Sequence, residues 1–155
     1  MAEGRFRDSG ASLFAFAHDV LVVCPRCSRR AVVSATADSS FAAPRRLVCA
    51  SCGLVKERDG RDSSWGEPID PWFHEQLWLA ARFRDQTVWA FNSAHATVLR
   101  EFVAASHRQR ADPMCPSGPR ITTMGMTEKL PAWFKAAGNR APLLKVLDSL
   151  IARAE

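Results

Sequence analysis

The sequence lacks the long apolar run that a membrane-spanning helix needs. None of its hydrophobic stretches approaches the roughly 18 residues required to cross a bilayer. Near the N-terminus, the apolar stretch 11–17 is too short for a secretory signal and is followed directly by His18 and Asp19. We therefore expect a chain without a membrane span in the cytoplasm, where thiols stay reduced and paired cysteines usually bind metal.

Recognisable catalytic motifs are also missing. There is no Gly-x-Gly-x-x-Gly, no Gly-Lys-Ser/Thr phosphate loop, no Gly-x-Ser-x-Gly elbow and no evident carboxylate pair. His74-Glu75 begins like a zinc-protease motif, but position 78 is Trp rather than His. His95 lies in the first turn of an expected helix, where hydrogen bonding or capping is the alternative to acid–base catalysis. The sequence predicts neither an enzyme nor a small-molecule substrate.

The chain has no polybasic arm, although its net charge is +5 and its pI is near 9.3. Residues 1–60 carry nine Lys/Arg and six Asp/Glu, and residues 61–155 carry twelve and ten, so the excess is +3 and +2. Such a mild excess permits nucleic-acid binding without requiring it. A hydrophobic content of 47% indicates a folded rather than a disordered chain.

What the sequence does have is two cysteine pairs of the same spacing. Cys24 and Cys27 form one pair, Cys49 and Cys52 form the other, and twenty-one residues separate them. Two residues between cysteines allow a tight turn to direct both sulfurs at one ion about 2.3 Å away. Four thiolates fill a tetrahedral coordination sphere, so we expect one structural Zn²⁺ per chain. Iron in a rubredoxin-like centre and a redox thiol pair are the alternatives, and Cys115 in a proline-rich loop is expected to be a free thiol.

Short strands are expected on both sides of each cysteine pair. They are predicted at 19–23 and 30–34 around the first pair and at 45–48 and 54–57 around the second, with 36–44 as a loop. Further along, the sequence predicts a hairpin, with a continuous helix as the alternative, and then helices separated by a loop. These elements are a hairpin of 77–81 and 87–91 with its turn near Asp85-Gln86, a helix from Asn92 or Ser93 to about Arg110, a loop at 111–123, and helices at 130–137 and 142–154.

The expected fold class is α+β, divided into three stretches. Residues 1–12 form a flexible tail, residues 13–60 a four-cysteine zinc ribbon, and residues 61–155 a small domain of one hairpin and three helices. A ribbon of this size has too few apolar residues for a core of its own, so zinc is expected to supply much of its folding energy.

Residues 20–58 resemble the zinc-ribbon modules of transcription and replication proteins, including those of the TFIIB type. The match rests on Cys24-Pro25-x-Cys27 and Cys49-x-x-Cys52-Gly53. The rest of the chain is similar to small bacterial zinc-ribbon proteins of unknown function, in the segments 77–79, 89–92 with His95, 130–135 and 139–140. The resemblance implies a ribbon with a structural zinc. Some proteins of this kind carry names taken from a replication-restart helicase, but this sequence holds no helicase motif.

Two groups of residues are candidates for contacts with partners. The first is a basic set around the cysteine pairs that could contact phosphates, with an ordinary solvated surface as the alternative: Arg26, Arg29, Arg30, Arg45, Arg46 and Lys56. The second is aromatic and could dock a partner, with core packing as the alternative: Trp72, Phe73 and Trp133.

These patterns favour a zinc-ribbon binding module associated with nucleic acid, of the replication or transcription accessory type. The alternative is a protein–protein interaction adaptor in which zinc is purely structural and no nucleic acid is bound. The two differ in one respect that can be measured directly, because phosphate contacts make affinity fall steeply with salt.

Overall fold

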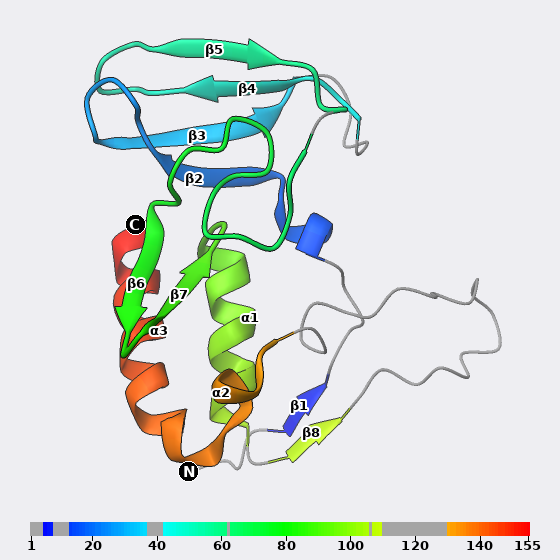
Figure 1. Ribbon diagram of the computed structural model, residues 1–155, viewed down its shortest axis with the longest axis vertical. Helices are drawn as coiled ribbons and strands as arrows, with labels where there is room; N and C mark the ends of the chain where they lie inside the picture. The colour runs from blue at the N-terminus through cyan, green and yellow to red at the C-terminus, as the bar shows by residue number, and fades with distance from the viewer. Residues whose placement is uncertain (1–4, 8–12, 37–41, 62, 106, 110–129) are drawn as a thin grey trace, which may run out of the picture.

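A computed structural model describes residues 5–7, 13–36, 42–61, 63–105, 107–109 and 130–155. The predicted loop at 111–123, including Cys115, lies outside these residues. The fold is mixed α and β, with a four-stranded sheet at one end of the molecule and a hairpin with helices at the other (Figure 1).

The four-stranded sheet contains the strands that the sequence predicted around the cysteine pairs. All neighbours are antiparallel, in the order β2 (Asp19–Val23), β3 (Arg30–Ala35), β4 (Arg45–Val48) and β5 (Val55–Arg58). Alternate residues of the first three strands point to one face and are buried. This buried face includes Val20, Val22, Ala31, Val33 and Leu47. A short 3-10 helix, η1 (Leu13–Phe16), precedes β2.

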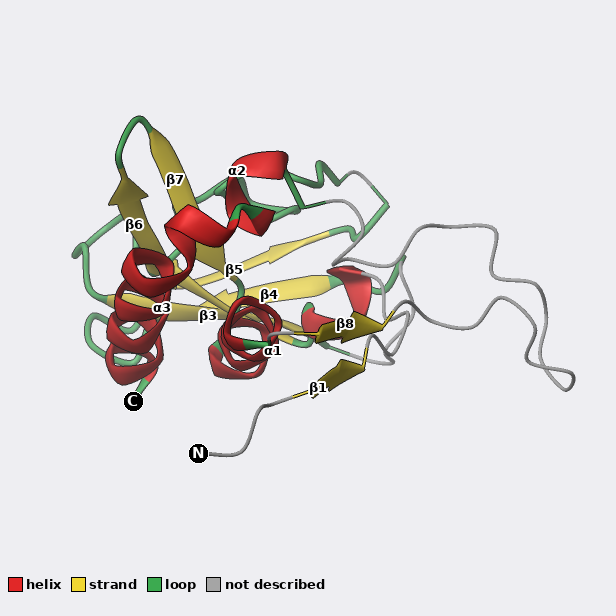
Figure 2. Ribbon diagram, turned by 90° about the horizontal axis from the view of Figure 1, so that it is seen from below, coloured by secondary structure: helices red, strands yellow, loops and turns green. Residues whose placement is uncertain are grey.

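The second part of the molecule is a hairpin packed against helices. Its elements are β6 (Leu79–Phe83), β7 (Gln86–Ala90), α1 (Ser93–Ala104), α2 (Ala132–Lys135), the 3-10 helix η2 (Ala137–Asn139) and α3 (Arg140–Ala154). Helices α1 and α3 lie side by side, and the hairpin covers them (Figures 1 and 2). Their apolar stripes form one core, to which Leu79, Leu99, Phe102, Leu143 and Leu147 contribute.

Several boundaries differ from the sequence prediction, and three of them change the course of the chain. Gln86 pairs with Phe83, so the hairpin turn is Arg84-Asp85. Helix α1 ends at Ala104, because residues 107–109 form strand β8 (His107–Gln109) instead of continuing the helix to Arg110. Strand β8 pairs in parallel with β1 (Arg5–Arg7), within the stretch predicted as a flexible tail. This pairing joins segments about a hundred residues apart, which local sequence patterns do not reveal.

Backbone hydrogen bonds join the two parts along the free edge of β2. Leu21 donates its N–H to the Phe91 carbonyl at 2.8 Å, and its own carbonyl accepts from Trp78 at 3.0 Å. Val23 donates to the Gln76 carbonyl at 2.8 Å. The segments that enter and leave the hairpin therefore lie against the four-stranded sheet. The predicted division into domains near residue 60 stays a prediction.

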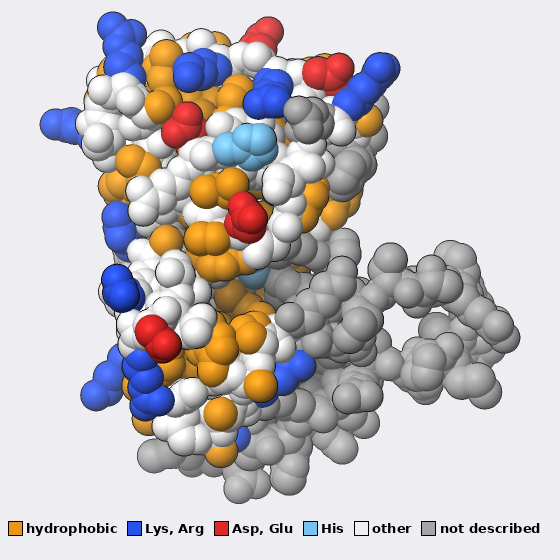
Figure 3. Space-filling model, in the orientation of Figure 1, with side chains coloured by type: hydrophobic (Ala, Val, Ile, Leu, Met, Phe, Trp, Pro, Cys, Tyr) orange, Lys and Arg blue, Asp and Glu red, His pale blue; other side chains and the backbone are white. Residues whose placement is uncertain are grey.

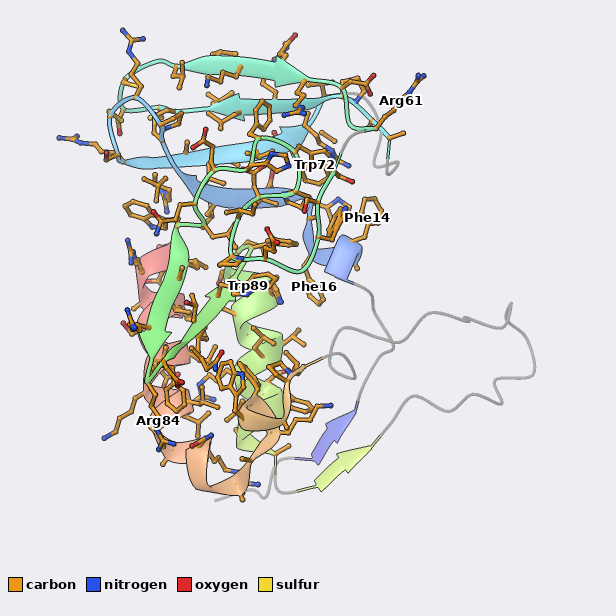
Figure 4. All side chains as sticks on the ribbon, viewed as in Figure 1. Phe14, Phe16, Arg61, Trp72, Arg84 and Trp89 are labelled. Atoms are coloured by element: carbon orange, nitrogen blue, oxygen red, sulfur yellow. The ribbon has the colours of Figure 1, made fainter. Side chains whose placement is uncertain are left out.

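Aromatic residues beyond the sheet cover its buried face. Trp72, Leu77 and Phe91 pack against the sheet valines, and Trp72 has no exposed surface (Figure 4). The Asp70 carboxylate turns the chain at this point by accepting the backbone N–H groups of Trp72 (3.0 Å), Phe73 (2.7 Å) and Glu75 (2.7 Å). Burial raises the pKa of Asp70, although these three donors act in the opposite direction.

Among the described residues, no helix combines the length and the apolar character needed to span a bilayer.

Candidate metal centre

The two cysteine pairs meet at one end of the four-stranded sheet. Cys24 follows β2 and Cys49 follows β4, and both strands run antiparallel to the β3 strand between them. Strands β2 and β4 therefore run in the same direction and end at the same end of the sheet, with β3 between them. Their turns into β3 and β5 lie together at the left end of the sheet in Figure 1.

The two turns have the same backbone hydrogen bonds. The first cysteine of each pair donates its N–H to the carbonyl five residues later, at 2.7 Å for Cys24 and 2.9 Å for Cys49. Its carbonyl accepts from the residue four positions later, at 2.9 Å in both turns. That fourth residue has a left-handed backbone, with φ of 64° at Ser28 and 77° at Gly53. The two cysteine turns therefore have the same backbone conformation.

The four sulfurs converge on a common point. The Sγ atoms of Cys24 and Cys52 are 3.7 Å apart, those of Cys27 and Cys49 are 3.5 Å apart, and all four lie within 4.8 Å of one another. A tetrahedron with metal–sulfur bonds of about 2.3 Å has edges of about 3.8 Å. Cys24 and Cys49 are buried, whereas Cys27 and Cys52 are half-buried. The predicted ligand set is therefore brought together in a geometry that can hold a metal ion.

The thiols of this cluster have widely different pKa values. The backbone N–H groups of Cys52 and Ser51 lower the pKa of Cys49 to about 6, against the effect of burial. At Cys27 the backbone N–H of Arg29 favours the thiolate, but burial and the three neighbouring sulfurs raise the pKa to about 11. Four thiolates at these separations repel one another, so complete deprotonation requires a cation among them.

The predicted phosphate-contacting residues occupy three different environments. Arg26 and Arg29 are exposed in the first cysteine turn, and Lys56 is exposed on β5. Arg30 is exposed at the start of β3, where its Nη1 donates to the Ala154 carbonyl at 2.7 Å. Arg46 forms an ion pair with Glu57 on the neighbouring strand.

Arg45 does not lie on the exposed surface that the sequence suggested. Its side chain is 1% exposed, and its guanidinium lies 4.0 Å from the centre of the Trp72 ring. Strict alternation along β4 could have revealed this, because Arg45 shares the face of buried Leu47. The buried pair holds the segment around Trp72 against the sheet.

The predicted docking aromatics are also partly internal. Trp72 has no exposed surface and packs in the core, which was the alternative to docking a partner. Phe73 is half-buried. Trp133 is half-buried and stacks on Phe83, with ring centres 5.8 Å apart and planes 17° apart.

His95 has a structural role in the core. Its Nδ1 accepts the backbone N–H of Phe91 at 3.0 Å, and its ring stacks on Phe16 at 5.2 Å. The ring of Trp89 meets the imidazole edge-on, with ring centres 5.9 Å apart, and Phe16 and Trp89 are labelled in Figure 4. Burial lowers the pKa of His95 to about 3, so the imidazole is neutral at physiological pH. The imidazole is almost completely shielded from solvent.

Comparison with known proteins gives no family assignment. No protein-family model matches the chain, and neither a curated protein nor a solved structure is significantly similar to it. Its function is therefore argued from its own fold and its own cysteine cluster.

Proposed function

We propose that this protein is a zinc-ribbon binding module that holds one structural Zn²⁺ and associates with nucleic acid, as replication and transcription accessory proteins do. The observation that carries the proposal is the convergence of Cys24, Cys27, Cys49 and Cys52 to within 4.8 Å, from two turns of the same backbone structure. Four thiolates leave the ion no open position for water or substrate, which supports a structural metal. We propose no catalytic activity.

Exposed arginines beside the cluster support the nucleic-acid part of the proposal. Arg26, Arg29 and Arg30 are all exposed within or just after the first cysteine turn. The chain carries a net charge of +5, so phosphate contacts would add to a favourable overall field.

The metal is tested by elemental analysis of the purified protein. We expect about one zinc per chain, lost when Cys24 or Cys49 is replaced by Ser. Iron would instead give the visible absorption of a ferric thiolate centre. A folded protein with no metal and with disulfides in its place would contradict the proposal.

Nucleic-acid association is tested by fluorescence anisotropy of labelled DNA and RNA, in single- and double-stranded form, over a series of salt concentrations. We expect an affinity that falls as salt rises, because phosphate contacts release counterions. Absence of binding by the zinc-loaded protein at low salt would refute this part of the proposal and leave the metal part standing.

A protein-interaction adaptor is the second candidate, and one observation favours it. Val48 and Val55 face each other across β4 and β5 on the outer face of the sheet, and their exposed fractions are 38% and 55%. An exposed apolar pair on a sheet is typical of protein contact surfaces. This candidate predicts no salt-dependent nucleic-acid binding and loss of a protein partner on Val55→Asp.

A further inference from the structure

Six exposed arginines come from segments that lie on the left of the molecule in Figure 1, and we call this set the arginine flank. Three belong to the first cysteine turn and the start of β3, and three to the hairpin and α3: Arg26, Arg29, Arg30, Arg82, Arg84 and Arg153. Lys and Arg side chains follow the left edge of the molecule in Figure 3, from the cysteine end of the sheet to the tip of the hairpin. Arg84 is labelled at that tip in Figure 4.

Direct contacts connect the two halves of this flank. Arg30 donates to the Ala154 carbonyl at 2.7 Å, which joins the start of β3 to the end of α3. The guanidinium of Arg153 lies 4.6 Å from the centre of the Trp78 ring, and Trp78 donates its indole N–H to the Arg153 carbonyl at 3.2 Å. From Trp78 the chain continues through β6 to Arg84. Six residues in an extended strand span about 20 Å, so Arg84 lies about that far from Trp78.

The charge of the arginine flank is largely uncompensated. Elsewhere arginines pair with acids, as Arg46 does with Glu57 and Arg100 with Asp148. Within the part of the chain that the structure describes, no carboxylate forms an ion pair with the six arginines of the flank. Asp85 and Glu155 are their acidic sequence neighbours, which leaves six positive against two negative charges. An external anion can therefore approach without displacing an internal one.

Aromatic rings hold two of these guanidinium groups in place. Arg153 lies over Trp78, and the guanidinium of Arg84 lies 5.3 Å from the centre of the Phe83 ring. A guanidinium that already stacks on an aromatic ring is partly ordered before binding. Such a side chain therefore loses less conformational entropy when it binds a ligand. A guanidinium also matches a phosphate group with two parallel hydrogen bonds.

We propose that the arginine flank binds the phosphate backbone of nucleic acid, with contacts from both the cysteine turn and the hairpin–helix part. The inference rests on the proposed nucleic-acid association and specifies its surface. A row of arginines longer than about 20 Å fits a repeating polyanion better than a single acidic side chain. It also differs from a membrane surface, which requires exposed apolar residues. Within the described ranges, the exposed large apolar residues are Val48 and Val55, and they lie instead on the outer face of the sheet.

The test compares flank variants with a matched control in the zinc-loaded full chain. The variants are Arg82→Gln with Arg84→Gln, and Arg153→Gln; the control is Arg61→Gln. Arg61 is exposed, approaches Asp59 at 4.0 Å and is labelled at the opposite end of the sheet in Figure 4. The probes are a labelled mixed-sequence DNA duplex about 20 base pairs long and a single strand of the same length, each titrated over a salt series.

We expect the double variant to weaken binding about tenfold at low salt and to reduce the log–log salt slope by about 2. Arg153→Gln should weaken binding about threefold and reduce the slope by about 1, whereas the control should bind like the wild type. Thermal unfolding of each variant verifies that its fold is unchanged.

Two results would overturn the inference in distinguishable ways. If the flank variants bind like the wild type while Arg46→Gln or Lys56→Gln weakens binding, nucleic acid binds the sheet face, and only the proposed surface is wrong. If the wild type binds neither probe at low salt, the nucleic-acid function itself fails, and the flank fails with it. If the protein binds vesicles that contain anionic lipid but neither nucleic-acid probe, the nucleic-acid function also fails, and the partner is a membrane.

Discussion

At the scale of single residues, Ser28 and Gly53 occupy equivalent positions in the two cysteine turns but differ in chemistry. Both have a positive φ, 64° at Ser28 and 77° at Gly53. A residue with a Cβ is strained in this conformation by about 1–2 kcal/mol, whereas glycine is not. In Ser28→Gly the relief of this strain is partly offset by the entropy that glycine adds to the unfolded chain. We therefore expect the free energy of unfolding to rise by about 0.5–1 kcal/mol. Denaturant titration of the zinc-loaded protein measures this change.

The converse variant is the control. Gly53→Ser should lower the free energy of unfolding by about 1 kcal/mol, through backbone strain alone. A Cβ at position 53 meets no atom within 4 Å, so no clash contributes. Equal effects of the same sign from the two variants would show that the turns are not equivalent in solution.

Arg45 and Arg46 are sequence neighbours with opposite environments. Arg45 is buried over Trp72, whereas Arg46 is half-exposed and pairs with Glu57. We expect Arg45→Ala to lower the free energy of unfolding by about 2–4 kcal/mol, since it removes a buried cation–π contact and leaves a cavity. Arg46→Ala should cost less than about 1 kcal/mol, as exposed ion pairs usually do. Urea denaturation of both variants measures the difference, and equal losses would contradict the buried placement of Arg45.

His95 makes stability depend on pH in a defined direction. An unfolded histidine binds a proton near pH 6.5, but burial lowers the pKa of folded His95 to about 3. Between these values the unfolded chain binds more protons, so the free energy of unfolding falls as the pH decreases below 6.5, and this loss ends near pH 3. At pH 5 the loss from this residue should be about 2 kcal/mol.

The contribution of His95 is isolated by comparison with His95→Gln, because acid also competes with metal for the thiolates. The amide oxygen of glutamine can still accept a hydrogen bond, but the side chain does not titrate. The difference in stability between wild type and variant should change by about 2 kcal/mol from pH 7 to pH 5. A difference independent of pH would mean that the imidazole is accessible to protons in the folded protein.

At the scale of elements, Asn92 connects the start of α1 to the sheet. Its Oδ1 accepts the N–H of His95 at 3.0 Å as the helix N-cap, and its Nδ2 donates to the carbonyls of Phe16 (2.6 Å) and Asp19 (3.0 Å). We expect Asn92→Ala to lower the free energy of unfolding by about 2–3 kcal/mol, from the lost cap and the unsatisfied carbonyls. Asn92→Ser keeps a cap acceptor and should lose about 1 kcal/mol less. Equal losses in calorimetry would show that the cap contributes nothing.

Local patterns predicted most of the elements but not their long-range partners. The strands beside the cysteine pairs, the hairpin and the N-cap at Asn92 follow from β-branched residues, spacing and capping chemistry, and all are present. The pairing of β1 with β8 depends on segments far apart in the sequence, and because β8 occupies residues 107–109, the end of α1 was predicted wrongly. In the site, the cysteine spacing predicted the convergence of the four sulfurs. Alternation along β4 indicates the burial of Arg45 beside Leu47, whereas the burial of Trp72 depends on which loop covers the sheet, and composition alone does not reveal that.

At the scale of the whole molecule, the described residues form two apolar cores, and only one of them includes cysteines of the cluster. One consists of residues from the hairpin, α1, α2 and α3, including Phe102, Phe134 and Leu147. The other joins the sheet valines to Trp72, Leu77 and Phe91, and it includes Cys24 and Cys49 of the cysteine cluster. Loss of a metal that holds these turns should therefore affect the second core directly and the first only through the edge of β2.

Metal removal distinguishes these two cores. After chelation, or in Cys24→Ser, we expect the amides of β3, β4 and β5 to exchange rapidly with deuterium, because the proposed zinc supplies much of the folding energy of the sheet. The amides of α1, α3, β6 and β7 should keep substantial protection, since the core that they share contains none of the four cysteines. Hydrogen exchange followed by mass spectrometry measures both sets in one experiment, and Ser51→Ala, in a turn but not a ligand, is the control.

If all amides lose protection together, the molecule is one cooperative unit whose hairpin and helices depend on the metal as strongly as the sheet does. If none do, the thiols alone hold the turns, and the proposed structural role of zinc is wrong.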